Sequence, residues 1–171
     1  VLLQGGGGVS VFALQFAKLF GARGIMTSSS PERCARLRSL GADETIDYVA
    51  QPQWDTAVRA LTGGHGVDLT VEVGGAATID RSVAATRRGG RVALVGLLTG
   101  VPAAVPSLFS AGASISPVMV GSRDDFEAMN RAIAFHRLRP VIDSRYGFEQ
   151  LPDALRHLQS GRHMGKIVID F

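Results

Sequence analysis

Short apolar runs along the chain alternate with longer segments in which apolar residues recur every three or four positions. The short runs predict buried strands, and the segments with a 3.6-residue period predict helices that lay one face on a core. Their alternation indicates right-handed crossovers and therefore a doubly wound α/β fold, with a parallel sheet of about six strands and helices on both faces, in three layers. The expected strands are 1–3, 24–27, 45–47, 67–73, 91–95, 114–120 and a final one at 166–169, with a short extended piece at 140–143. The expected helices are 9–20, 31–40, 54–61, 77–86, 124–135 and 151–159.

The helices carry recognisable start and stop signals. The first is expected to end at Gly21, and the second to begin with Ser30 as its cap and Pro31 in its first position. Glu72 is unusual because it lies in the fourth expected strand, where a parallel sheet is normally apolar, so we expect it to face a crevice or to pair with an arginine. The apolar stripe expected on the first helix consists of Val9, Phe12, Ala13, Phe16, Ala17 and Phe20.

The composition fits one globular domain. The 171 residues are 46% hydrophobic, and their 21 glycines exceed the usual share of roughly 7%. The net charge is +3, but no basic run is longer than Arg87–Arg88 and only 6% of residues are aromatic, which disfavours nucleic-acid binding. The apolar region 92–120 is interrupted by glycine and proline, so it is not expected to cross a membrane.

Candidate metal ligands are few. Cys34 is the only cysteine, which excludes an internal disulfide and a cysteine-rich zinc site and indicates a structural thiol. The four histidines show no metal-ligand spacing, so this chain is not expected to bind zinc. Because residue 1 is not Met and no leader precedes the first apolar run, we expect the chain to begin within a longer gene product and the protein to be cytoplasmic.

A glycine-rich segment, 4–10, lies between the first expected strand and the first expected helix. Dinucleotide-binding turns occupy this place: Gly5 makes the tight turn, Gly7 lets the backbone approach a pyrophosphate, and a small residue, here Ser10, allows close packing of helix on strand. An ordinary structural turn remains the alternative. The 161–167 segment has the wrong spacing for a P-loop.

The end of the second expected strand bears on which dinucleotide would bind. A carboxylate at this place would hold the ribose hydroxyls of NAD, but the sequence is Thr27–Ser30, without an acid. These hydroxyls, with Arg33 one helical turn later, suit a 2′-phosphate, so the sequence favours NADP over NAD. The alternative is that the serines only cap the helix and that Arg33 is solvated.

The chain resembles the cofactor domain of the medium-chain dehydrogenase/reductases, the superfamily of zinc-type alcohol dehydrogenases and quinone reductases. The resemblance covers essentially the whole chain and implies a Rossmann domain over 1–140, with a tail, 141–171, that returns toward an N-terminal GroES-like domain absent here. That absent domain supplies the catalytic and any zinc-binding residues of the family. The motifs are Gly5–Ala13, Leu40–Asp43 with Ile46–Tyr48, Thr62–Asp68, Val71–Gly75, Arg88–Arg91 and Ser160–Val168.

The resemblance also implies a set of cofactor-binding residues on this chain. Around the pyrophosphate it places Gly5, Gly7, Gly8 and Val9, with Lys166 nearby. At the adenosine end it places Ser28, Ser29, Arg33, Tyr48, Val73 and Gly74. Toward the nicotinamide it places Gly96, Leu97, Leu98, Val118, Met119 and Val120. For Tyr48 and Lys166, packing and a solvated charge are equally open readings, and no catalytic residue is expected on this chain.

These observations predict the NAD(P)(H)-binding domain of an oxidoreductase that moves a hydride between nicotinamide and an alcohol, a carbonyl or an activated alkene. Alone, the chain is expected to bind cofactor without turnover, because the substrate would lie against the missing domain. A homodimer is expected through the edge strand 114–120. The alternative is a non-catalytic redox-sensing or structural module that binds a dinucleotide. A methyltransferase is disfavoured by the missing acid at Thr27–Ser30, and a short-chain dehydrogenase because neither tyrosine is followed four residues later by lysine.

Overall fold

The computed structural model describes residues 1–171, and its centre is a six-stranded parallel sheet. The strand order is β3-β2-β1-β4-β5-β6, so the chain builds outward from β1 in one direction and then from β4 in the other. This reversal is the hallmark of a doubly wound sheet, and the predicted fold class is confirmed. The strands are β1 (Leu2–Gln4), β2 (Ile25–Ser28), β3 (Glu44–Asp47), β4 (Val67–Glu72), β5 (Thr86–Leu94) and β6 (Ser114–Pro117).

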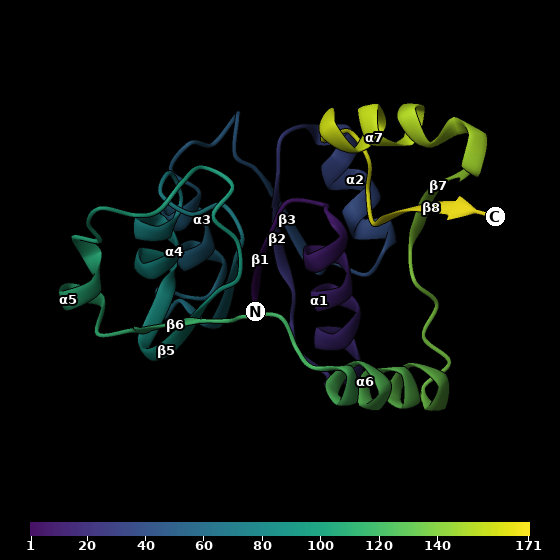
Figure 1. Cartoon of the computed structure of the whole chain (residues 1–171). Helices are drawn as coiled ribbons and strands as arrows, with labels where there is room; N and C mark the ends of the chain where they lie inside the picture. Colours follow the sequence, from purple (N-terminus) through teal and green to yellow (C-terminus); the bar gives the residue numbers. More distant parts are fainter.

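Helices cover both faces of this sheet. In Figure 1, α1 and α2 lie on one side of the β1–β3 strands, and α3 and α4 lie on the other. Short α5 lies between β5 and β6 along the chain, and α6 crosses below α1. The bounds are α1 (Gly8–Leu19), α2 (Pro31–Ser39), α3 (Trp54–Leu61), α4 (Ile79–Ala85), α5 (Ser107–Ala111) and α6 (Arg123–Phe135).

Alternation along the strands divides the core between the two faces. Successive strand residues point to opposite sides, so Leu2 packs in the cluster with Trp54 and Val58 of α3, whereas Leu3 packs with Leu14 of α1. All five of these residues are 5% exposed or less. The first strand therefore supports helices on both sides, which explains why it reads as a continuous apolar run.

The apolar stripe predicted for α1 is correct for Ala17, which is buried, and for Ala13, which packs against the core, and wrong for the other residues. The buried positions are Ser10, Val11, Leu14 and Ala17, which have the expected helical spacing. Val9, in the first turn of α1, is 48% exposed, and Phe20, which caps the C-terminal end of the helix, is 88% exposed. Phe12 and Phe16 stack on each other with ring centroids 6.1 Å apart, a contact that shields large rings without placing them in the core.

Helix caps follow the sequence signals closely. The Ser30 hydroxyl accepts a hydrogen bond from the Arg33 N–H, and Pro31 occupies the first turn of α2. Cys34 is buried inside this helix, as expected for a structural thiol. The start of α6 is stronger than predicted, because Ser122 and Asp125 form a reciprocal capping box. None of the helices combines the length and apolar character needed to span a membrane.

Several strand limits differ from the prediction. β5 begins at Thr86, ahead of the expected 91–95, because the stretch around Gly89 and Gly90 continues the strand past a register shift. β6 ends at Pro117, so 118–120 leave the sheet; proline lacks the N–H that would continue a ladder. The extended piece expected at 140–143 is a longer strand, β7 (Ile142–Gly147).

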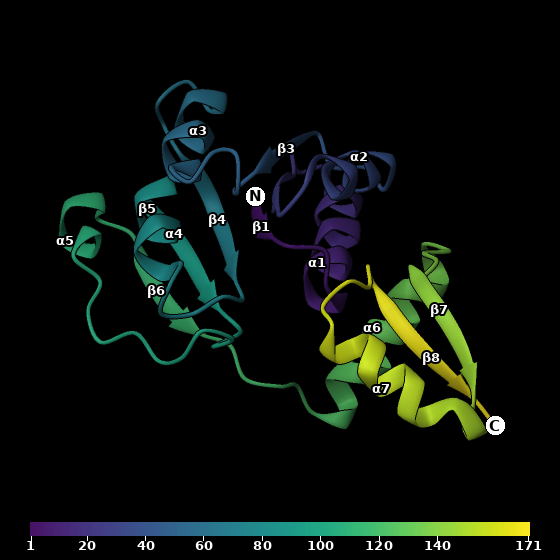
Figure 2. The ribbon, with the colours of Figure 1, turned by 90° about the horizontal axis from the view of Figure 1, so that it is seen from above.

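The tail forms a small unit of its own. After β7 come a 3-10 turn (Phe148–Gln150), α7 (Leu151–Gln159) and β8 (Lys166–Asp170). β7 and β8 pair in parallel as a separate two-stranded sheet, and Figure 2 shows them beside α6 and α7, away from the main sheet. The final strand therefore pairs only with β7 and adds nothing to the six-stranded sheet.

Candidate functional site

The turn between β1 and α1 presents unpaired backbone N–H groups. Gly5 has a φ of 70°, which glycine adopts without strain, and its N–H donates to the Thr27 carbonyl over 2.8 Å. At the start of α1, Gly7 offers no side chain to cap the helix, and the first turn holds no acidic residue. The first N–H groups of a helix lack helical partners and lie at the positive end of its dipole. This turn can therefore hold a phosphate group.

Space for such a group lies directly outside Gly7. A Cβ atom at Gly7 would meet no other atom within 4 Å, so the backbone there borders open space. On the inner side, the Ser10 hydroxyl donates to the Gln4 carbonyl and is 2% exposed, which ties α1 closely to β1. The predicted use of a small residue at position 10 for close helix–strand packing is confirmed.

A cleft of about 650 Å³ opens in front of this turn. Ligands of doubly wound sheets bind at this kind of place, where the strand order reverses between β1 and β4. None of the 19 residues that line the cleft is an aspartate or a glutamate. The predicted cofactor residues among them are Gly5, Gly7, Gly8, Val9, Ser28, Ser29, Arg33, Tyr48, Val73, Gly96 and Leu98. The others are Gln4, Gly6, Ser10, Val95, Leu158, Gln159, Gly161 and His163.

The end of β2 contributes an unsatisfied hydroxyl to the cleft. Ser28 is 1% exposed, and its Oγ has no hydrogen-bond partner. Buried polar atoms are normally paired, so this hydroxyl is available to a bound ligand. Ser29 is exposed beside it, and Tyr48 on the same wall is 42% exposed, which excludes a core packing role for this tyrosine.

Arg33 reaches the cleft from α2 with its guanidinium held by backbone. One terminal nitrogen donates to the Arg162 carbonyl over 2.8 Å, and the other donates to the His163 carbonyl over 3.2 Å. The reading of Arg33 as a solvated side chain is therefore wrong. No salt bridge includes Arg33, so its positive charge at the cleft is not neutralised by a carboxylate.

The segment before β8 closes one side of the cleft, which sequence reasoning missed. The Gly165 N–H donates to the Gly6 carbonyl over 2.9 Å, and Gly165 also forms a bridge with Gly7. Met164 is 1% exposed beneath this contact. Burial lowers the pKa of His163 from its usual value, since the charged imidazolium would lose water there. No local pattern joins residues from opposite ends of the chain, and only the glycines on both sides hinted at close backbone approach.

Some predicted cofactor residues do not line the cleft. Gly74 lies below it, where its N–H donates to Glu72 Oε1 over 2.6 Å. Leu97 follows β5, and the three residues after β6 are exposed at 42%, 84% and 94% for Val118, Met119 and Val120. Their predicted place beside the nicotinamide stays a prediction.

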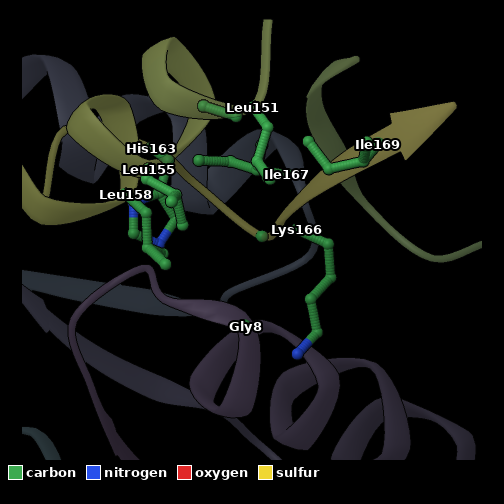
Figure 3. A pocket seen from close by; sticks show the side chains of 10 residues that line it. Gly8, Leu151, Leu155, Leu158, His163, Lys166, Ile167 and Ile169 are labelled. Atoms are coloured by element: carbon green, nitrogen blue, oxygen red, sulfur yellow. The ribbon is translucent and has the colours of Figure 1, made fainter. Parts of the chain in front are cut away.

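Lys166 lies beside the start of α1, at a second, smaller pocket. Figure 3 shows its side chain extending from β8 toward Gly8, and a Cβ at Gly8 would be 2.8 Å from Lys166 Nζ. The same ammonium lies 6.0 Å from the centre of the Phe12 ring. The pocket of about 240 Å³ is otherwise lined mainly by apolar residues of α7 and β8. Lys166 therefore places a positive charge beside the start of α1, but its side chain is exposed, so its contact with a pyrophosphate stays a prediction.

Charged and metal-ligating residues elsewhere form no further cofactor site. Glu72 neither faces the cleft nor pairs with an arginine, contrary to both expectations; it is fully buried among hydrogen-bond donors. His157 lies 3.6 Å from Asp143 and shares a hydrogen bond with the Tyr146 hydroxyl. No group of three or more histidine, cysteine, aspartate or glutamate side chains is placed to hold a metal ion, so these residues do not fit a zinc site.

Comparison with known proteins identifies the family to which this chain belongs. The family model described as zinc-binding dehydrogenase matches residues 8–134, from α1 through almost all of α6. The chain belongs to the zinc-binding dehydrogenase family. The match begins within the glycine-rich turn, and the relatives of the chain are oxidoreductases of the medium-chain dehydrogenase/reductase type.

Individual relatives match nearly the whole zinc-binding dehydrogenase domain. A zinc-type alcohol dehydrogenase-like protein of Schizosaccharomyces pombe is 35% identical over 99% of the chain. The crystal structure of an NAD-dependent alcohol dehydrogenase has 35% identity and a TM-score of 0.88 over 99% of the chain. A mycobacterial protein solved in complex with NADPH has 28% identity and a TM-score of 0.81 over 98% of the chain. The chain spans 51%, 50% and 56% of these three proteins, about half of each.

Proposed function

We propose that this chain is the nicotinamide-dinucleotide-binding part of an oxidoreductase that transfers a hydride between the nicotinamide ring and an alcohol, a carbonyl or an activated alkene. The observation that carries this proposal is the uncapped start of α1 at Gly7, which faces a cleft of about 650 Å³ at the reversal of strand order. Membership of the zinc-binding dehydrogenase family supports it.

The residues of the cleft fit a dinucleotide along its length. The N–H groups that follow Gly7 would bind the pyrophosphate, and Lys166 would add a positive charge from the tail. The Ser28 hydroxyl would bind the adenosine ribose or its phosphate. Val95 and Gly96 would lie toward the nicotinamide, whose ring supplies the hydride chemistry when the dinucleotide is bound. This chain therefore contributes binding and orientation, and we expect it to turn over no substrate alone.

We propose further that the cleft prefers NADP(H). A 2′-phosphate carries negative charge, and the cleft lacks any carboxylate to repel it, whereas Arg33 brings a positive charge that no acid neutralises. NAD-selective sites instead use an acid at the end of the second strand to bind both ribose hydroxyls. Relatives include both an NAD-dependent enzyme and an NADPH complex, so the preference rests on these residues of the chain.

Calorimetric titration with NADPH and NADH tests both proposals. The wild-type chain is expected to bind both dinucleotides, and NADPH at least tenfold more tightly. Arg33→Ala should weaken NADPH binding at least tenfold and change NADH binding less than threefold, because the 2′-phosphate is the only part of NADPH that NADH lacks. Arg38→Ala, which removes an exposed arginine from the same helix, is the control and should change neither.

The possible results separate the two roles of Arg33. If Arg33→Ala lost affinity for NADPH and NADH equally, the guanidinium would act by anchoring the carbonyls of Arg162 and His163. This result would contradict the NADP preference. Equal binding of NADPH and NADH by the wild type would contradict it too. Absence of binding by the wild-type chain would contradict the proposed function.

We also propose that two copies pair through the β6 edge. β6 is the last strand of the sheet, and a strand at this position exposes unpaired backbone groups. The residues that follow it are exposed and apolar: Val118, Met119 and Val120. Pairing of two such edges would bury this patch and continue the sheet across both copies.

A further inference from the structure

A fully buried carboxylate lies below the cleft without any cation. Glu72, at the end of β4, has 0% of its surface exposed, and neither arginine nor lysine contacts it. Burial of an unpaired charge is costly unless hydrogen bonds replace its water. Five donors do so here: Gly74 N at 2.6 Å, Thr78 Oγ1 at 2.7 Å, Gln4 Nε2 at 2.8 Å, Gly75 N at 2.9 Å and the Ser82 hydroxyl.

Gln4 is the second half of this network and reaches the wall of the cleft. Its amide nitrogen donates to Glu72 and to the Ser82 hydroxyl at 2.7 Å, and its amide oxygen accepts from the Val73 N–H at 3.1 Å. Its backbone carbonyl accepts the Ser10 hydroxyl at the start of α1. One hydrogen-bonded cluster therefore connects the turn after β4, the glycine-rich turn after β1 and the first turn of α1.

The two walls joined by this cluster both line the cleft. Gln4 and Ser10 line it on the side of the glycine-rich turn, and Val73 lines it on the side of β4. Glu72 does not line it, so any effect of Glu72 on a ligand must pass through these neighbours. The Glu72 carboxylate accepts hydrogen bonds from Gln4 on one wall and from the turn after β4 on the other, so it links the two walls at a set distance.

Position 72 needs a side chain that only accepts hydrogen bonds, because all five partners of Glu72 donate to it. A glutamine of the same size would turn an amide N–H₂ toward groups that also donate, and leave buried polar groups unpaired. Exchange of the two side chains would avoid this conflict. Glutamate at position 4 would accept hydrogen bonds from the Val73 N–H and the Ser82 hydroxyl. Glutamine at position 72 would donate from its amide nitrogen to the new glutamate and to the Ser82 oxygen.

We propose that Glu72 is a positioning residue for the dinucleotide: its carboxylate, through Gln4 and the Val73–Gly75 turn, fixes the spacing of the two walls of the cleft. This role rests on the proposed dinucleotide-binding function. It differs from a purely structural role, because it predicts a loss of affinity in a chain that is still folded.

The test compares NADPH affinity, measured by calorimetry, with the melting temperature for three variants. Glu72→Gln should weaken NADPH binding at least tenfold at a temperature where circular dichroism shows a folded chain. The exchanged pair Gln4→Glu with Glu72→Gln moves the carboxylate to the cleft lining, so it should not reach wild-type affinity, but it should bind NADPH at least threefold more tightly than Glu72→Gln alone. The control is Thr70→Val, which removes a fully buried hydroxyl from the same strand; it should lower the melting temperature with affinity changed less than twofold.

The possible results separate a positioning role of Glu72 from a purely structural one. A folded Glu72→Gln chain that binds NADPH like the wild type would overturn the positioning role. If Glu72→Gln does not fold, the exchanged pair decides: recovery of the fold with measurable NADPH binding supports the role, and a folded pair without NADPH binding overturns it. No binding by the wild-type chain would overturn the proposed function and this role with it, whereas normal wild-type binding with unchanged variants would overturn this role alone.

Discussion

At the scale of single residues, Gly7 shows how the absence of a side chain makes a binding site. Its φ of −71° is open to any residue, and a Cβ there would meet no protein atom within 4 Å. The fold therefore does not require glycine at position 7. A phosphate bound close to the backbone would require it, because a side chain would occupy the same space. Gly7→Ala is expected to change the free energy of unfolding by less than about 1 kcal/mol and to weaken NADPH at least tenfold.

Chemical denaturation and calorimetry of the same samples check the Gly7→Ala prediction. Gly147→Ala is the matched control, since Gly147 also has a negative φ, −68°, and lies outside the cleft. It should leave the affinity unchanged. Unaltered NADPH binding by Gly7→Ala would show that the ligand does not approach the backbone at this turn.

At the scale of elements, an ion pair joins the end of α1 to the segment that leads into β3. Lys18 on α1 donates to both carboxylate oxygens of Asp43 at 2.8 Å, and the Gly24 N–H before β2 donates to the same group at 2.7 Å. The hydrogen bond from Lys18, aided by that from Gly24, lowers the pKa of Asp43 from its usual 3.8. The contact thus joins the end of α1 to the starts of two neighbouring strands of the sheet, β2 and β3.

The lowered pKa of Asp43 predicts a pH-dependent contribution to stability. A carboxylate with a lowered folded-state pKa stabilises the fold above its unfolded-state pKa, and this contribution disappears as pH falls through the folded-state value. Because the side chain is 36% exposed, solvent screens the pair, and Asp43→Asn should cost about 1 kcal/mol or less at pH 7. The difference from wild type should shrink below about pH 4.

Urea denaturation of Asp43→Asn and wild type between pH 7 and pH 3 measures this difference. Glu149→Gln, at an exposed carboxylate without a hydrogen-bonding cation, is the control and should match wild type across the range. A deficit in Asp43→Asn that stayed constant down to pH 3 would mean that the pair contributes through packing rather than charge.

At the scale of the whole molecule, the strand order leaves the outer edge of β6 unpaired at one end of the sheet. The exposed apolar residues Val118, Met119 and Val120 follow this strand. Light scattering after gel filtration is expected to give the mass of two chains for wild type and of one chain for Met119→Lys, because a buried lysine at the pairing edge would lose its hydration. Phe20→Lys, at an 88% exposed residue of the α1 terminus, should remain a dimer. A monomeric wild type would contradict edge pairing.

The local patterns predicted much of the fold because they reflect local physics. The Ser30–Pro31 signal gave the start of α2, and the glycine turn at 4–10 gave the start of α1, since caps and tight turns depend on neighbouring residues. The buried face of α1 was misjudged because Phe12 and Val11 are both apolar, and only the docking of the helix on β1 decides which one is inside. The same limit applied to Phe20, which no pattern distinguishes from a core residue.

The sequence by itself determined the order along the chain of the strands in the main sheet and of every helix except α5, the parallel sheet, the dinucleotide-type turn and the absence of an acid at the end of β2. These follow from periodicity, turn chemistry and short-range spacing. Only the tertiary structure decided that the tail closes the cleft through Gly165 and Gly6, that Arg33 is held by the carbonyls of Arg162 and His163, and that Glu72 is buried among donors. The physical reason is the same in each case: such contacts join residues far apart along the chain, and their partners are set by packing rather than by local pattern.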